Sequence, residues 1–259
     1  MMFDAETESW TKLEHLPSMW GVLCCHVVVR REDRVRIYTF DECNKTCAFA
    51  DIDGPGQWTV LEAELTMPRW GACAVQLDDD TIVICGGLCR GKETASCDRF
   101  NLTTHTISWF PEMVERRSSH AGVHYNGKIV VIGGEVAGKA GGTLCEEFDP
   151  SYDVWGGFAS LNEGRWGAGA AVVGGKIYVA GGFKVQSVEV YDGSAWTVIA
   201  DLPVTVLGTG AVALGGRLAV FGITGPFSEE MRVFDPVTGA WTLVERPVKD
   251  RPSNSIVSF

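Results

Sequence analysis

The 259-residue chain has no long apolar run and no segment with helical periodicity. Its first ten residues, MMFDAETESW, are acidic and polar, so we expect neither a secretory signal nor a membrane span. Basic residues are also scarce, with 22 Lys and Arg against 33 Asp and Glu and a net charge of −11. An acidic surface repels phosphate backbones and anionic lipids, so neither nucleic acid nor a membrane is an expected partner.

Residues that often carry catalysis are few, with 5 Tyr and 5 His scattered along the chain. The glycines are not followed by Lys-Ser/Thr or by a helix, as a phosphate-binding loop requires. No Ser or Cys lies in a recognisable nucleophile elbow. We therefore predict no enzymatic activity, no cofactor and no metal.

The cysteines do not have the pattern of a disulfide framework. There are 9, an odd number, and they include the adjacent pair Cys24 and Cys25. We interpret them as reduced thiols, which favours a cytoplasmic protein, with the nucleus as the alternative location.

A tryptophan recurs along the chain and closes the same short pattern each time. In the clear copies, an aromatic residue followed by Asp stands a few residues before the tryptophan. These copies end at Trp10, Trp155, Trp196 and Trp241, and looser copies end at Trp58 and Trp109. Successive tryptophans are 41 to 51 residues apart. This period indicates one supersecondary unit that buries its apolar face against the next copy, so residues 1–259 are predicted to form one domain.

Each copy contains four strand-like pieces separated by turn residues. A segment of small apolar residues is followed by a β-branched run that ends in glycines, at Gly86-Gly87, Gly133-Gly134 and Gly181-Gly182. The third piece holds the aromatic residue and the fourth holds the tryptophan. Short runs of this kind predict an antiparallel meander, and radial packing of such sheets covers both faces of each one.

The glycine pair, the aromatic-Asp pair and the tryptophan, as in IYVAGG, EVYD and the following Trp196, resemble the kelch repeat over essentially the whole chain. The resemblance implies an all-β, six-bladed β-propeller with four-stranded antiparallel blades. Two copies depart from the pattern, because 34–40 has lost its glycine pair and the copy around Phe221 keeps only Gly222. We expect those two blades to be irregular.

One strand is missing from the count. The chain opens in the third strand of a blade and ends in a first strand, SNSIVSF, and it contains five glycine-ending second strands for six blades. One hypothesis is a ring closed by pairing of the two termini, with an incomplete closing blade. The alternative is that the chain is a fragment of a longer protein, because an absent strand leaves exposed edges.

The best candidate site is the set of loops that join a fourth strand to the next first strand. In a four-stranded meander these loops share one face with the loops between strands two and three. Aligned loops place Arg and Trp at equivalent positions near one mouth of the channel, and Arg and Trp are common binding anchors. The predicted partner-binding residues are Trp20, Arg69, Trp70, Arg117, Arg165, Trp166 and Arg251.

A structural interpretation of the same residues remains open: the tryptophans could pack between blades while the arginines pair with acidic neighbours. The irregular loops from Leu88, Glu135 and Ile223 could set specificity or be ordinary solvent loops.

Other polar clusters are weaker candidates. His120 and His124 lie on a predicted strand, about 13 Å apart, which is too far to share a metal ion. Four thiols, Cys43, Cys47, Cys89 and Cys97, fall in predicted adjacent loops without the usual zinc spacing. Residues 78–80, all Asp, are predicted to form a solvated hairpin turn.

The favoured function is a non-catalytic protein-interaction module. The resemblance implies a substrate receptor of a cullin-RING ubiquitin ligase, partnered by an F-box or BTB domain, although no helical segment precedes Trp10 to supply one. Kelch-like propellers also include copper-radical oxidases, sialic acid epimerases and actin-associated scaffolds, so an enzyme or a cytoskeletal scaffold is the alternative.

Overall fold

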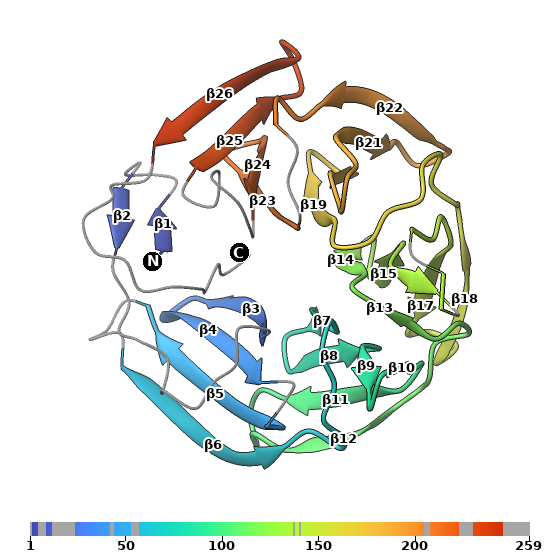
Figure 1. Ribbon diagram of the computed structural model, residues 1–259. Helices are drawn as coiled ribbons and strands as arrows, with labels where there is room; N and C mark the ends of the chain where they lie inside the picture. The colour runs from blue at the N-terminus through green and yellow to red at the C-terminus, as the bar shows by residue number, and fades with distance from the viewer. Residues whose placement is uncertain are drawn as a thin grey trace.

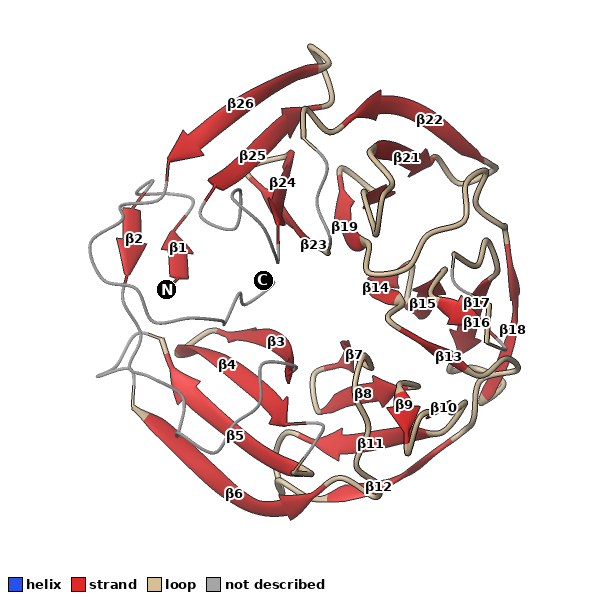
Figure 2. Ribbon diagram, in the orientation of Figure 1, coloured by secondary structure: helices blue, strands red, loops and turns tan. Residues whose placement is uncertain are grey.

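The computed structural model describes residues 2–4, 9–11, 24–41, 44–52, 57–136, 138–139, 141–204, 208–222 and 230–245. These residues form strands, turns and loops, and no helix among them is long and apolar enough to cross a membrane. Figure 2 shows strands and loops throughout this part of the chain.

The described strands form five four-stranded antiparallel sheets that stand around a central channel like blades (Figure 1). Blade 1 contains β3 (Cys24–Arg31), β4 (Arg34–Asp41), β5 (Thr46–Asp51) and β6 (Trp58–Glu64). Blade 2 contains β7 (Cys73–Asp78), β8 (Thr81–Cys85), β11 (Cys97–Asn101) and β12 (Ile107–Phe110). Blade 3 contains β14 (Ala121–Tyr125), β15 (Lys128–Ile132), β17 (Cys145–Asp149) and β18 (Val154–Phe158).

The remaining strands complete the ring. Blade 4 contains β19 (Gly169–Val173), β20 (Lys176–Ala180), β21 (Ser187–Tyr191) and β22 (Trp196–Asp201). Blade 5 contains β23 (Thr209–Leu214), β24 (Arg217–Gly222), β25 (Glu230–Asp235) and β26 (Ala240–Glu245). Two short ladders lie in the loops, and they pair β9 (Leu88–Cys89) with β10 (Lys92–Glu93) and β13 (Arg117–Ser118) with β16 (Glu135–Val136).

A two-stranded sheet of β1 (Met2–Asp4) and β2 (Ser9–Thr11) lies between blade 5 and blade 1 (Figure 1). The all-β propeller with four-stranded antiparallel blades is therefore confirmed. The β1–β2 pair matches the predicted third and fourth strands of a closing blade. The segment SNSIVSF lies outside the described residues, so the six-blade count and the closure by the two termini stay predictions.

The small residues of the first strands are explained by how closely neighbouring blades approach near the axis. A methyl group on Gly122 of β14 would lie 2.6 Å from Cys73 Sγ of blade 2. A methyl group on Gly169 of β19 would lie 2.6 Å from the Ala211 nitrogen of blade 5. The second strands lie deeper, and all five residues of β8 are buried, as expected for a strand covered on both faces.

The glycine pairs close the second strands in a left-handed conformation. Gly133 and Gly134 have φ values of 62° and 97°. Added methyl groups would lie 2.7 Å from the Arg165 oxygen and 2.6 Å from the Ser118 oxygen, respectively. A neighbouring backbone thus packs where a side chain would otherwise lie, which explains the glycines at these positions.

The repeated tryptophans of blades 3 and 4 connect each of these blades to the one before it. Trp155 and Trp196 are buried, and their indole nitrogens donate to the carbonyl oxygens of Pro111 and Ala159 at 2.9 and 2.8 Å. Each lies beside the aromatic residue of the third strand, as in the Phe148–Trp155 pair with ring centroids 5.5 Å apart. These rings therefore bury a large apolar area between neighbouring sheets.

Trp109 is an exception that corrects the alignment of the repeat. Phe100 pairs with Ile107 in blade 2, so Ile107 occupies the position of the repeated tryptophan. Trp109 lies two residues further along and is 67% exposed. Blades 1 and 5, predicted to be irregular, have all four strands, although the register between β5 and β6 shifts near Thr46 and Ala48.

The first prediction concerns the glycine pairs. Gly133→Ala should lower the free energy of unfolding by about 2–4 kcal/mol, because it adds a clash to a positive φ. The matched control is Gly127→Ala, since Gly127 has a φ of 77° and no atom within 4 Å of an added methyl group. Urea unfolding should show a loss of about 1 kcal/mol for the control, from backbone strain alone. Equal losses in the two variants would contradict this account of the glycine pair.

Candidate functional site

One mouth of the channel is formed by the fourth-to-first-strand loops together with the loops between second and third strands; we call this surface the loop face. A chain of backbone hydrogen bonds links its blades. Ser119 N donates to Gly71 O at 2.6 Å, Gly167 N to Ser119 O at 2.7 Å, and Thr209 N to Gly167 O at 2.8 Å. The four loops that enter blades 2 to 5 are therefore held in register with one another.

A buried arginine holds each of three of these loops to its own blade. In blade 2, Arg69 Nη1 donates to the carbonyl oxygens of Gly86 and Ser96 at 3.2 and 2.8 Å. Its Nη2 lies 3.1 Å from Asp98 Oδ2. The guanidinium thus joins the entry loop, the glycine pair, the end of the second-to-third-strand loop and the third strand. We call this arrangement the arginine clasp.

The clasp is repeated in the next two blades with the same atoms. Arg117 Nη1 donates to the Gly133 and Leu144 oxygens, both at 2.8 Å, and Arg165 Nη1 donates to the Gly181 and Ser187 oxygens at 2.9 and 2.8 Å. Their Nη2 atoms donate to Glu146 at 2.5 Å and to Glu189 at 2.7 Å, respectively.

The acidic partners of the clasps also receive backbone hydrogen bonds. Glu146 accepts from the nitrogens of Val114 and Glu115 at 2.6 and 3.0 Å. Glu189 similarly accepts from Asn162 N and Glu163 N, and Asp98 accepts from Thr66 N. A buried carboxylate with a guanidinium and peptide donors is well compensated for its loss of hydration.

These observations correct the expected role of the arginines and favour the structural alternative. Arg69, Arg117 and Arg165 are 1%, 0% and 1% exposed, so their guanidinium groups offer no surface to a docked partner. The sequence pattern did not single out the acidic partners of these arginines. Each acidic residue, Asp98, Glu146 or Glu189, lies two positions before the aromatic residue of the third strand, and that spacing is the signal that would have found them.

The tryptophans of the same loops are more accessible. Trp70 is 41% exposed, and its backbone exchanges two hydrogen bonds with Leu88. Trp166 is half-buried, with its ring 4.8 Å from that of Phe183, and Lys184 Nζ lies 5.2 Å from the Phe183 ring centroid. Trp20 and Arg251 lie outside the described residues, and their predicted role is unchanged.

On the loop face, the loops between second and third strands are basic although the chain is acidic, whereas the fourth-to-first-strand loops carry the exposed acids Glu112 and Glu163. In the described loops between second and third strands of blades 2, 3 and 4, every exposed charged side chain is a cation: Arg90, Lys92, Lys139 and Lys184. Glu93, in contrast, is half-buried and accepts a hydrogen bond from Gly138 N at 3.0 Å. Arg90, Lys92 and Lys139 lie in the irregular loops from Leu88 and Glu135 that the sequence indicated as candidates for specificity, whereas Lys184 lies in the loop of blade 4, which was not among them.

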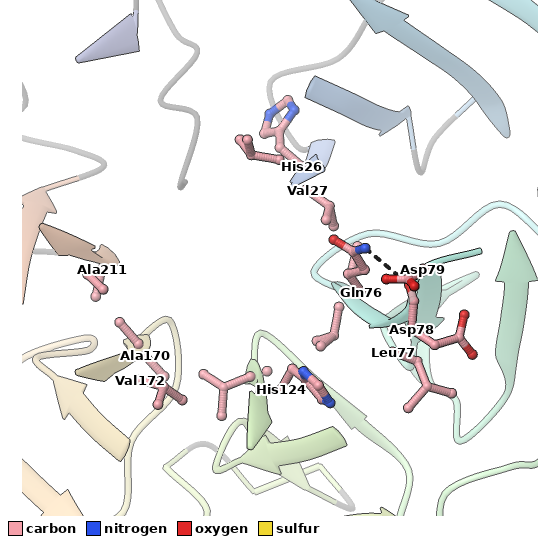
Figure 3. A pocket seen from close by; sticks show the side chains of 17 residues that line it. His26, Val27, Gln76, Leu77, Asp78, Asp79, His124, Ala170, Val172 and Ala211 are labelled. Atoms are coloured by element: carbon pink, nitrogen blue, oxygen red, sulfur yellow. Dashed lines mark hydrogen bonds between the residues drawn. The ribbon is translucent and has the colours of Figure 1, made fainter. Parts of the chain in front are cut away.

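A hollow with a volume of about 560 Å³ lies inside the channel (Figure 3). Its walls are the first strands of all five blades and are largely Ala and Val, with polar side chains from Gln76, Asp78 and His124. His26 also lines it, and burial lowers the pKa of this imidazole to about 4. The imidazole is therefore neutral at pH 7, so His26 adds no positive charge to the wall of the hollow.

The weaker candidates fall in different places. His120 is buried and precedes β14, whereas His124 is exposed. The expected loop position of the thiols is wrong for Cys47 and Cys97, which are buried on β5 and β11, and Cys43 lies outside the described residues. Among the described residues, no group of three His, Cys, Asp or Glu side chains could hold a metal ion.

Comparison with known proteins agrees with this architecture. The Kelch motif model matches residues 165–203. The chain is 26% identical over 216 residues to mouse Kelch-like protein 15, covering 71% of this chain and 35% of that protein. It is 27% identical over 237 residues to the Arabidopsis thaliana F-box/kelch-repeat protein At1g67480, covering 86% of this chain and 62% of that protein.

The chain thus spans about a third of the length of Kelch-like protein 15. The solved structure of YjhT has a similar fold, with a TM-score of 0.71 over 87% of this chain and 84% of that one, at 16% identity.

The second prediction tests the structural role of the clasp. Arg117→Ala should lower the free energy of unfolding by about 3–5 kcal/mol, because it leaves Glu146 as a buried and unpaired carboxylate. Arg116→Ala is the matched control, since Arg116 is the exposed neighbouring arginine, and it should change stability by no more than about 0.5 kcal/mol. Urea unfolding of both variants gives the comparison. A fully stable Arg117→Ala protein would show that the clasp carries little of the fold.

Proposed function

Because the chain is a kelch-repeat β-propeller, we propose that it is a protein-interaction module whose loop face binds an acidic segment of a partner protein. The observation that carries this proposal is the combination of accessible aromatic rings and exposed cations on one face of a chain with a net charge of −11. The similarity to kelch-repeat proteins such as Kelch-like protein 15 also supports a role in binding protein partners.

The rings and the cations would have different tasks. Trp70 and the Trp166–Phe183 pair offer flat apolar surface, which suits an apolar or aromatic anchor of the partner. Lys92, Lys139 and Arg90 would attract carboxylates and speed the encounter, since complementary charge acts mainly on the association rate. The clasps hold the loops that carry these groups, so the face is largely preformed before binding.

We further propose that the whole protein presents its partner to a cullin-RING ubiquitin ligase. This finer proposal rests on similarity to an F-box/kelch-repeat protein. It requires a ligase-binding domain beyond these 259 residues or on a bound protein. A cytoplasmic or nuclear location is part of the same proposal. That the chain is not an enzyme stays a prediction, and the hollow of about 560 Å³ is the place where a small ligand would fit if it is one.

The third prediction concerns the loop face. Trp70→Ala/Trp166→Ala and Lys92→Glu/Lys184→Glu should each reduce partner capture from cytosol by at least about ten-fold while the melting temperature changes little. Quantitative mass spectrometry of the captured proteins provides the measurement. Added salt, which screens exposed charges, should reduce capture by the wild type as the charge variant does.

The matched controls carry the same residue types on other surfaces. Trp109→Ala removes an exposed tryptophan from the outer strand of blade 2, and Lys176→Glu reverses an exposed charge beside the hairpin between β19 and β20. Both should keep the captured set. If the controls lose the same proteins, or if the loop-face variants keep them, binding occurs elsewhere on the protein. Cullin-RING components in the wild-type set would support the ligase proposal, and a dominant partner without them would count against it.

A further inference from the structure

Three cysteines lie side by side across blade 2. Cys73 of β7 is directly opposite Cys85 of β8, and Cys85 is in turn directly opposite Cys97 of β11. All three are buried, at 8%, 0% and 1% exposed, in the cluster that packs blade 2 against blade 3. We call this row the thiol row.

The thiol row is a departure from the repeat. At the equivalent positions blade 4 has Gly169, Ala180 and Val188, and blade 3 has Ala121, Ile132 and a single cysteine, Cys145. Blade 1 has cysteines at the outer two positions, but Phe40 stands between them. In the described blades, only blade 2 places thiols on three adjacent strands.

A second departure faces the first. His120 of the loop entering blade 3 stands where the equivalent loops have Ala72 and Ala168, three residues after the clasp arginine. It is 6% exposed, and neither of its ring nitrogens has a hydrogen-bond partner of normal geometry. The imidazole is close enough to Cys73 to contribute to the lowered pKa of that thiol. An imidazole of this kind is costly to bury unless it interacts with a group such as a thiolate.

Neighbouring positions in the row have the spacing that a disulfide needs. Directly opposed residues of an antiparallel pair have Cα atoms about 4.5–5.5 Å apart, and disulfides span about 4.4–6.8 Å. Cys73 and Cys85 are already within side-chain hydrogen-bonding reach, as are Cys85 and Cys97. Either disulfide could form with little movement of the backbone.

The electrostatic environment separates the roles of the thiols. A hydrogen bond from the Cys85 thiol, together with the nearby His120 and Arg117 side chains, lowers the pKa of Cys73, and this effect exceeds the opposing effect of burial. Burial and the same hydrogen bond raise the pKa of Cys85. Cys73 is also the most exposed of the three, so a small oxidant meets the best nucleophile of the row first.

We propose that the thiol row is a site of reversible oxidation, at which peroxide converts Cys73 and Cys85 into a disulfide that Cys97 can take over by exchange. The Cys73 thiolate attacks one oxygen of hydrogen peroxide, the O–O bond breaks, and a sulfenic acid and hydroxide form. The Cys85 thiol then gives up its proton, and its sulfur attacks the sulfenic sulfur and expels hydroxide, which leaves as water. Two thiols and one peroxide give one disulfide and two waters.

The central position of Cys85 allows the exchange step. Cys97 and Cys73 flank Cys85 on opposite sides, so the Cys97 thiolate can attack the Cys85 sulfur from the side away from Cys73. The Cys85–Cys97 bond forms as the Cys73–Cys85 bond breaks, and Cys73 leaves as a thiolate. No electrons are gained or lost in this step.

The fourth prediction is tested on reduced full-length chain treated with one equivalent of hydrogen peroxide. Non-reducing peptide mapping by mass spectrometry should find disulfides within the thiol row, and Cys73 should react at least about ten-fold faster than Cys145. Cys145 is the matched control, because it occupies the position of Cys97 in blade 3 and burial raises its pKa to about 11. Dithiothreitol should restore the free thiols.

Four variants separate the steps. Cys85→Ser should leave a Cys73 sulfenic acid that a carbon nucleophile traps, and Cys97→Ser should trap the Cys73–Cys85 disulfide. Cys73→Ser should abolish the fast reaction. His120→Ala, which restores the residue of the other loops, should slow it by about ten-fold at neutral pH and less at high pH, where Cys73 ionises without help.

Two results would overturn the proposal. One is a thiol row that stays reduced while the more exposed Cys25 and Cys89 take up the peroxide. The other is a stoichiometric metal in the purified protein that Cys73→Ser removes, since the row would then be a ligand set.

Discussion

Three buried guanidinium groups tie the loop face of this propeller to its blades. Each arginine clasp replaces the water around one arginine with two backbone carbonyls and a carboxylate, as Arg165 does with Gly181, Ser187 and Glu189. Such a pair need not add much net stability, because both charges lose their hydration. It does fix geometry, since few loop conformations place all these acceptors around one guanidinium. The position of the loops that carry Trp70, Trp166 and the exposed cations follows from it.

In the five described blades, the arginine and its acidic partner are either both present or both absent. Blade 5 has Val206 at the arginine position of the sequence and Arg232 in place of the acid, and blade 1 has Met19 and Ala48 at these positions. Keeping one charge without the other would bury an unpaired ion, which costs far more than losing both. The two blades without a clasp are those that flank the β1–β2 pair (Figure 1). The proposed binding residues that the structure describes, in contrast, lie in the loops of blades 2, 3 and 4.

Much of the fold could be predicted from the sequence because the same pattern occurs in several copies along the chain. The strands β8, β15 and β20 end directly before the glycine pairs, as predicted, since a burial pattern repeated at fixed spacing is a strong signal. The site was harder. Arginine at a loop suggests a surface contact, and only the acid two residues before each aromatic, such as Glu146, reveals its burial. Trp109 was wrongly assigned to the position of the repeated tryptophan. The sequence does not reveal the shift of two residues along β12, which follows only from the pairing of Ile107 with Phe100.

The measurement that tests the central claim most directly is a double-mutant cycle on the clasp of blade 4. The free energy of unfolding is compared for the wild type, Arg165→Met, Glu189→Gln and the double variant. If the clasp fixes the loop face, each single variant should lose several kcal/mol, and the coupling energy between the two sites should be at least about 2 kcal/mol. Additive and small effects, with a coupling near zero, would contradict the claim and would leave the loops of this face to be held by their backbone hydrogen bonds alone.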